Sequence, residues 1–282
     1  MSNNKHKKKS LDKHSCENCD NSHDKREPVS YEHHIEPPFW GTGEILTWEP
    51  KQLVDAINKD ELFKKEAVDC IYPDDYETAK REVLEPFFEK YTKEIVDSQL
   101  INPRGFFGYF PVITDKETLI LIDPSDFCTE LAEFKFPRID GGSWADYFNP
   151  DGDIIGFQVV TIGDKLTEKG SRLVSSANFD SPLDLNSDFM GSKFLDGLGC
   201  SMIDIMAKRV SVELARGIGL APGFGARYSF GDYGMPPLHD LKNLFEILGI
   251  EERLGIYLTH NFEMIPKHSS VGIFIRNCEA EC

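Results

Sequence analysis

The apolar residues of one long stretch recur every three or four positions, which is the spacing of an amphipathic helix. The stretch covers residues 74–99, and its apolar positions are Leu84, Phe87, Phe88, Tyr91 and Ile95. Further helices are predicted at residues 50–58, in the following ELFKKEAV, over residues 192–216 and in KNLFEILGI. The chain is therefore expected to carry long helices in both of its halves.

Other segments are typical of β-strands because they are rich in β-branched and aromatic residues. RGFFGYFPVI (104–113) and ETLILID (117–123) are predicted to pair around the turn TDK, and GDIIGFQVVTIG (152–163) to form another strand. RLGIYLTHNFEMIP and SSVGIFIRN are expected to close the sheet. Strands and helices do not alternate regularly, which favours an α+β fold: a single domain with a twisted, largely antiparallel sheet and long inserted helices.

Residues 1–34 are polar and poor in aliphatic side chains, so they cannot bury enough apolar surface to offset the entropy of ordering. We expect a disordered tail there and a folded domain over residues 35–282. Cys16 and Cys19, with two histidines close by, admit two interpretations. They form a small zinc site, or they belong to a flexible tail that happens to carry thiols. Because no second pair of this kind follows, no metal ligands are assigned.

The chain is strongly acidic, with 282 residues, a formal net charge of −17 and a pI of about 4.9. Nucleic acids and anionic membranes bind to basic surfaces, so this charge argues against both as partners. No apolar run approaches the length of a membrane span, and no apolar segment follows the basic N-terminus as in a secretory signal. The cysteines are scattered rather than arranged as a disulfide scaffold. A cytoplasmic protein with reduced thiols is expected.

Several common catalytic signatures are missing from the sequence. These are the phosphate-binding P-loop, the Rossmann glycine fingerprint, the HExxH motif of zinc proteases and the GxSxG elbow of serine hydrolases. Acidic residues are abundant, but none is singled out by its context for acid–base catalysis. His239 and His260 are expected to be structural. The glycines of LDGLGCS (Leu195–Ser201) lie in an apolar helical pattern and are expected to allow close helix packing.

The stretch ARYSFGDYGMPPLHDLKNLF (Ala226–Phe245) is too rich in glycine and proline for a core strand. Together with the residues up to Ile275, it resembles the C-terminal S-adenosylmethionine-binding reactivation domain of cobalamin-dependent methionine synthase. The matching pieces are an Arg-x-x-x-Gly loop with a tyrosine close behind, LFEILG, LGIYLT and a Ser-rich strand ending in GIFI. PPFWG, INKDELF, RGFFGYFP and ADYFNPDGDIIGFQVVTIG resemble earlier parts of that domain in the same order, so the resemblance covers residues 35–277.

The resemblance implies a reactivation subunit that binds S-adenosylmethionine and supplies its methyl group for the reductive methylation of cob(II)alamin, in methionine biosynthesis. This chain lacks the D-x-H-x-x-G sequence of a cobalamin module. The cobalamin is therefore expected on a partner corrinoid protein, with a flavodoxin or ferredoxin as electron donor. Such a reaction needs orientation of the methyl group rather than a general base, because the cofactors supply the chemistry.

The resemblance also assigns ligand contacts to individual residues of the loop. Arg227 is expected to take the methionine carboxylate of the ligand through a charge-assisted hydrogen bond. Ser229, Phe230 and Gly231 place backbone near the adenosine, and glycine lets that backbone come close. Tyr233 packs on the nucleoside, lies at the rim that faces the corrin and is assigned the catalytic role.

The sequence departs from the family pattern at several positions. Asp232 is inserted before the loop tyrosine, where it either pairs with the ammonium or sulfonium of the ligand or disturbs the pocket. Asn58 takes the place of an acidic residue that meets the ligand ammonium in many members, and Gly197 and Cys200 replace an arginine and a glutamate. Two alternatives therefore stay open. One is a module that docks on a corrinoid protein without using S-adenosylmethionine, and the other is a metal-linked interaction protein that uses the N-terminal cysteine pair.

Overall fold

The structure is a computed structural model that describes residues 36–69, 76–150, 152–176, 188–221 and 224–276. The tail predicted for residues 1–34, with its cysteine pair, lies outside these residues. The described helices are α1 (Pro50–Val54), α2 (Lys59–Asp69), α3 (Tyr76–Ala79), the π-helical turn η1 (Lys80–Leu84), α4 (Glu85–Asp97), α5 (Lys165–Ser176), α6 (Asp188–Gly217), α7 (Leu241–Leu248) and α8 (Ile250–Leu254), with 3₁₀ turns η2 (Trp144–Tyr147) and η3 (Leu238–Asp240).

One large antiparallel sheet organises the molecule. Its described strands are β1 (Gly41–Thr42), β2 (Leu46–Thr47), β3 (Arg104–Asp115), β4 (Thr118–Ile122), β5 (Glu130–Lys135), β6 (Asp153–Thr161), β7 (Ala226–Tyr228) and β10 (Ser269–Ile275). The order is β5-β4-β3-β6-β10-β7, and β2, β1 and β4 pair one after another with the edge of β3 that β6 leaves free. The predicted α+β fold with a largely antiparallel sheet is confirmed.

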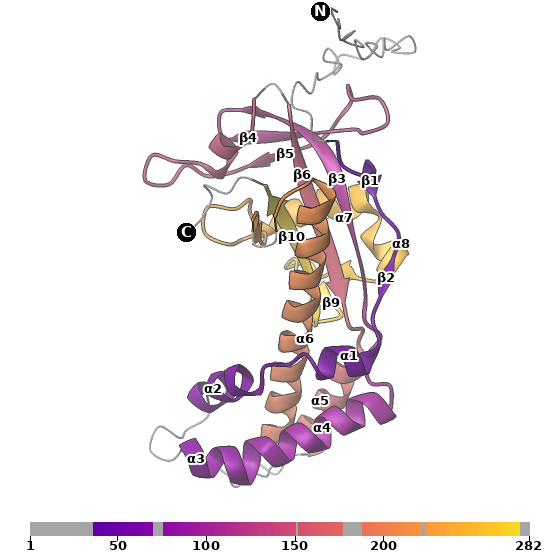
Figure 1. The fold of residues 1–282 in the computed structure, drawn as a ribbon, viewed down its shortest axis with the longest axis vertical. Coiled ribbons are helices and arrows are strands. Elements are labelled where there is room, and N and C mark those ends of the chain that lie inside the picture. Colours follow the sequence, from indigo (N-terminus) through magenta and orange to yellow (C-terminus); the bar gives the residue numbers. More distant parts are fainter. Residues whose placement is uncertain (1–35, 70–75, 151, 177–187, 222–223, 277–282) are drawn as a thin grey trace, which may run out of the picture.

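The two faces of the sheet carry different layers. Helix α6, which is 30 residues long, runs along one face and continues past the sheet to a group formed by α2, α3, α4 and α5 (Figure 1). Helices α7 and α8 pack on the other face. Successive strand residues point to opposite faces, so β6 feeds both cores. Ile154 and Val160 belong to the core with α6, and Ile155, Phe157 and Val159 to the core with α7 and α8.

Long periodic segments were predicted well, whereas one predicted closing strand is wrong. The helix expected over residues 74–99 is present as the contiguous α3, η1 and α4. In RLGIYLTHNFEMIP, the first two residues end α8, and Gly255 then takes a left-handed conformation (φ 69°) that terminates the helix. The rest forms the small separate hairpin of β8 (Tyr257–Leu258) and β9 (Met264–Ile265).

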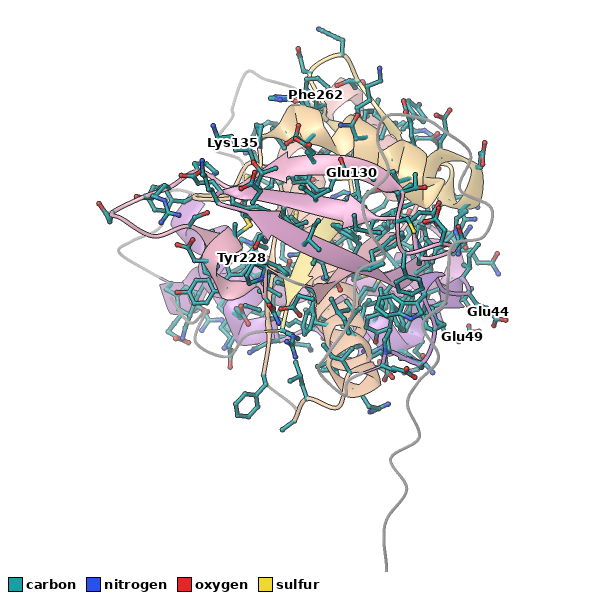
Figure 2. All side chains as sticks on the ribbon, turned by 90° about the horizontal axis from the view of Figure 1, so that it is seen from above. Glu44, Glu49, Glu130, Lys135, Tyr228 and Phe262 are labelled. Carbon is teal, nitrogen blue, oxygen red and sulfur yellow. The ribbon has the colours of Figure 1, made fainter. Side chains whose placement is uncertain are left out.

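The longest elements without a counterpart in the sequence-based expectations are α5 and β5. Figure 2 looks down on the sheet from above, with Glu130 and Lys135 marking the two ends of β5. Strand β5 pairs with β4 through a register irregularity at Leu121 and Ile122. Its side chains are mostly only half-buried or exposed, which explains why no clear alternation marks it in the sequence.

Candidate functional site

A polar cluster lies on the face of the sheet that packs against α6. Arg227 of β7 pairs with Phe274 of β10, and Gly272 of β10 pairs with Gln158 of β6. Because opposite residues of an antiparallel pair point to the same face, these positions and Ser270 share one face. Phe274 belongs to the core with α6, which identifies that face. Three neighbouring strands, β6, β10 and β7, thus bring polar side chains next to the long helix.

The Arg227 side chain lies across β10 at Gly272. A Cβ atom on Gly272 would come within 2.7 Å of Arg227 Nε and 3.2 Å of Gln158 Nε2, so a larger residue would displace them. Arg227 Nη2 donates a hydrogen bond to Ser270 Oγ, while Arg227 Nε has no partner among the residues that the structure describes. Glycine at this position therefore provides the space in which the guanidinium and the Gln158 amide come together.

No carboxylate of the described residues contacts the buried guanidinium of Arg227 directly. Burial lowers the pKa of Arg227, and the carboxylates of Asp204 on α6 and Asp232 in the following loop oppose this shift. Within the described residues, Arg227 forms no ion pair with either of them. A desolvated cation without a direct counter-ion is costly, so this position is suited to an anionic ligand group.

Gln158 is the second incompletely satisfied group of the cluster. Its side chain is 1% exposed in a strand whose other residues are almost all apolar. Its Oε1 accepts a hydrogen bond of 3.4 Å from Ser211 Oγ on α6, whereas its Nε2 has no partner among the described residues. Buried donors are normally satisfied, so two such donors above one glycine indicate a place for a ligand or for water.

The loop after β7 is held in shape by its own backbone. Asp232 Oδ2 accepts from the Ser229 backbone nitrogen at 2.7 Å, and Gly231 donates to the carbonyl of Pro236 at 2.8 Å. Gly231 has φ 82°, a conformation that favours glycine. The carboxylate of Asp232 thus has a structural contact within the loop and also contributes to the field at Arg227.

The two aromatic residues of the loop lie in opposite environments. Phe230 is buried, with its ring 5.6 Å from that of Phe134, so only its backbone can meet a ligand. Tyr233 is 77% exposed. The structure brings Arg227, Ser229 and Asp232 together, as the sequence suggested, and leaves Tyr233 on the surface.

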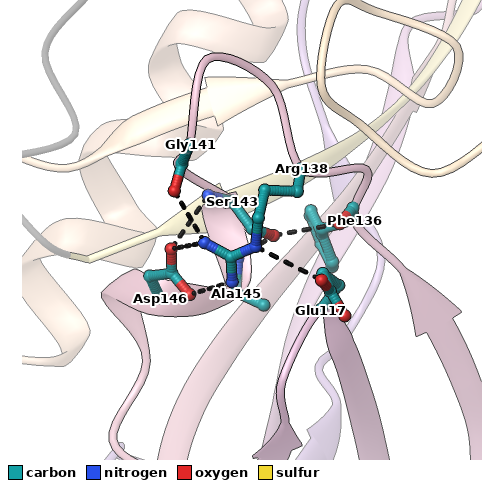
Figure 3. A network of polar contacts seen from close by, with 7 residues as sticks. All are labelled: Glu117, Phe136, Arg138, Gly141, Ser143, Ala145 and Asp146. Atoms are coloured by element: carbon teal, nitrogen blue, oxygen red, sulfur yellow. Dashed lines mark hydrogen bonds and ion pairs between the residues drawn. The ribbon is translucent and has the colours of Figure 1, made fainter.

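A second loop, residues 136–147 between β5 and β6, supports the first. Arg138 donates to Glu117, to the Gly141 carbonyl and, at 2.9 and 3.0 Å, to both carboxylate oxygens of Asp146 (Figure 3). These hydrogen bonds hold the pKa of Asp146 below its usual value. Trp144 in this loop lies 4.4 Å, ring centre to ring centre, from Tyr228, the last residue of β7.

The comparisons with known proteins decide the family. Residues 51–282 match the model of the vitamin B12 dependent methionine synthase activation domain. The chain belongs to this family. A crystal structure titled as the MetH reactivation domain bound to AdoHcy has a TM-score of 0.70 and 17% sequence identity, and the match covers 89% of this chain and 83% of that one. No curated protein matches the chain. None of the described helices is both long and apolar enough to cross a membrane.

Asn58, assigned to the site by its place in the activation-domain pattern, has a local role in the structure. It directly precedes α2, and its Oδ1 accepts a hydrogen bond of 3.3 Å from the backbone nitrogen of Glu61. This contact is typical of a residue at the start of a helix, where backbone N–H groups lack partners. Asn58 is also uncharged, so it would stabilise the ammonium of a ligand less than a carboxylate at this position would.

Sequence reasoning missed the residues on the floor of the site. The register of β10 with β6 brings together Gln158, Ser270 and Gly272, and the sequence of one segment alone does not reveal this register. One signal was available, because a glutamine inside the run IIGFQVVTI is unusual for a strand buried on both faces. Asp204 carries no such signal, since exposed acidic residues are common on this chain.

Proposed function

We propose that this activation domain binds S-adenosylmethionine between α6 and β10 and supplies its methyl group to cobalamin carried by a partner corrinoid protein. The observation that carries the proposal is the pair of donors above Gly272, Arg227 Nε and Gln158 Nε2, which have no partner in the part of the chain that the structure describes. Membership of the activation-domain family supports the choice of ligand.

The side chains suit the two ends of the amino-acid part of the ligand. Arg227 takes the carboxylate, because a guanidinium offers two parallel donors to it. Asp204 and Asp232, which already act electrostatically on Arg227, meet the positive ammonium and sulfonium. The ligand thereby supplies the counter-ion that Arg227 lacks.

The loop after β7 holds the nucleoside. The backbone of Ser229, Phe230 and Gly231 lies against the adenosine, and the buried Phe230 ring keeps that backbone in place. Tyr233 contacts the nucleoside from the rim and faces the corrin. In the reaction, cobalamin on the partner, reduced by one electron from a flavodoxin or ferredoxin, takes the methyl group from the sulfonium and leaves S-adenosylhomocysteine. The chain itself contributes orientation and exclusion of water.

This function places the chain in the cytoplasm, in methionine biosynthesis, as a subunit that acts on a separate corrinoid protein. The folded domain begins before the family match, because β1 and β2 pair with β3 and precede residue 51. We therefore propose a domain boundary near residue 35, which the pairing of β1 and β2 with β3 supports.

One observation favours a second function, that of a docking module which no longer uses S-adenosylmethionine. Asn58 is neutral, and its side-chain oxygen already accepts a bond from its own helix. The ammonium of a ligand would lose a carboxylate partner there, while the exposed Tyr233 would still serve docking.

Calorimetric titration separates the two functions. We expect S-adenosylmethionine and S-adenosylhomocysteine to bind one to one with micromolar affinity. 5′-Methylthioadenosine, which has the nucleoside without the amino-acid part, should bind much more weakly because it lacks the carboxylate that Arg227 takes. Absence of heat and of any thermal shift at millimolar ligand would rule out the first function and leave the docking module.

A further inference from the structure

Three potential metal ligands of different chemistry meet beside α6, outside the proposed ligand contacts. Asp196 and Cys200 are four residues apart on α6, so they lie on the same face of the helix. His268 comes from the segment just before β10, and its side chain is almost fully buried. The carboxylate, thiol and imidazole atoms all lie within 4.8 Å of one another.

The spacing of these atoms is close to that of a tetrahedral zinc site. Zinc binds imidazole nitrogen and carboxylate oxygen at about 2.1 Å and sulfur at about 2.3 Å, which sets the donor atoms about 3.5 Å apart. His268 Nε2 and Asp196 Oδ1 are already 3.0 Å apart. The three donors therefore need movements of about 1 Å or less to enclose an ion, which side-chain rotation supplies.

His268 is held in the orientation that a ligand requires. Its Nδ1 lies 3.1 Å from Thr167 Oγ1 on α5, and Gly199 leaves room for the ring, since a Cβ atom there would lie 2.4 Å from His268 Nε2. A hydroxyl can accept or donate. When Nδ1–H donates to Thr167, the lone pair of Nε2 is free to face the ion, as is usual for metal-bound histidines. The close packing expected at LDGLGCS is thus present at Gly199, and it makes space for an imidazole.

A path from solvent to two of these side chains, Asp196 and His268, is present. Asp196, Lys267 and His268 help to line an open hollow of about 540 Å³ between α5 and α6. Lys267 Nζ contacts Asp196 Oδ1 at 2.6 Å, but the lysine side chain is largely exposed and can turn into water when an ion replaces it. The Asp196 carboxylate would then bind a divalent cation in place of the exposed ammonium of Lys267.

We propose that Asp196, Cys200 and His268 form a zinc site with one coordination position open to water. Nitrogen and sulfur donors select zinc over magnesium and calcium, which prefer oxygen ligands alone. On binding, the Cys200 thiol gives up its proton to solvent and the imidazole carries its remaining proton on Nδ1. Its three ligands are not among the residues proposed to hold S-adenosylmethionine.

The test uses the full chain with Cys16→Ser and Cys19→Ser, so that the N-terminal pair cannot take the metal. Metal-free protein is titrated with zinc by calorimetry and with cobalt(II) by absorption, which reports thiolate bonding. We expect uptake of one ion per chain. Cys200→Ser and His268→Gln should each weaken uptake at least tenfold, whereas Cys128→Ala, which removes a buried thiol elsewhere, should leave it unchanged.

A second measurement avoids substitutions at the site. Zinc should slow alkylation of Cys200 at least tenfold in the same protein, as followed by peptide mass spectrometry, because a bound thiolate does not react freely. No uptake, uptake that Cys200→Ser leaves unchanged in a variant of normal melting temperature, or Cys200 alkylation that zinc does not slow would each overturn the proposal. In that case Asp196 and His268 form only a hydrogen-bonded contact between α6 and the segment before β10.

Discussion

Replacing Arg227 with alanine should weaken S-adenosylmethionine binding while hardly changing the stability of the ligand-free domain. The substitution removes a guanidinium that lies across Gly272 and donates to Ser270 Oγ, but whose Nε has no partner within the described part of the chain. This side chain therefore has more bonds to gain from a ligand than it makes in the free protein.

The expected magnitudes follow from those contacts. Loss of a hydrogen bond to a charged group costs about 1.5–3 kcal/mol of binding free energy, or about 10- to 150-fold in affinity. In the free protein, loss of the bond to Ser270 is opposed by relief from burying a cation without a counter-ion. These two terms are of similar size, so the unfolding free energy should change by about 1 kcal/mol or less.

The assay combines calorimetric titration with thermal unfolding without ligand. Arg216→Ala is a matched control, since Arg216 is an exposed arginine at the end of α6 that pairs with Glu213. The control substitution should change neither the binding free energy nor the unfolding free energy by more than about 0.5 kcal/mol. Unchanged affinity of Arg227→Ala would refute the carboxylate contact. A large fall in melting temperature would show that Arg227 is chiefly structural.

Three other outcomes are expected. Deleting residues 1–34 should leave the melting temperature nearly unchanged, and a clear drop would contradict the disordered tail. Tyr233→Ala should slow methylation of the partner's cobalamin at saturating ligand more than it weakens binding, as followed in the cobalamin spectrum; an unaffected rate would contradict a docking role. Tyr109→Phe should cost about 1 kcal/mol at pH 7, because the hydroxyl donates to the Leu214 carbonyl at 2.9 Å. Burial raises the pKa of Tyr109, so the hydroxyl contributes fully to the free energy of unfolding below about pH 10 and this contribution is lost as the pH rises further. In denaturant unfolding from pH 7 to 11, Tyr109→Phe should therefore lose less unfolding free energy than the unchanged protein.

The sequence predicted the elements that have a strong period or an apolar run. The helix around Phe87 and Phe88 and the strands β3, β4, β6 and β10 are of this kind, since burial on a defined face imposes the pattern. The two-residue strands β1 and β2 carry no such signal. Their place in the sheet comes from contacts with β3, far along the chain.

The candidate site was predicted in part, for a related reason. Arg227 stood out because a Gly/Pro-rich loop follows it, and local composition reveals such loops. Gln158 and Ser270 were missed because they join Arg227 only through strand register. His268 was missed in the same way. A single histidine before a strand becomes a candidate metal ligand only when the fold places it beside Asp196 and Cys200 of α6.

The loop after β7 has one end fixed in the core and one end exposed to solvent. These two ends suit the two tasks of the proposed function, which are holding the ligand and contacting the partner protein. Phe230 anchors the loop in the core, Arg227 lies inward on the sheet, and Tyr233 extends into solvent only six residues further on. A ligand held at Arg227 is therefore shielded by the same backbone that presents Tyr233 outward. We therefore expect changes at Tyr233 to act on the partner more than on the ligand, because the Phe230 anchor keeps the intervening backbone in place.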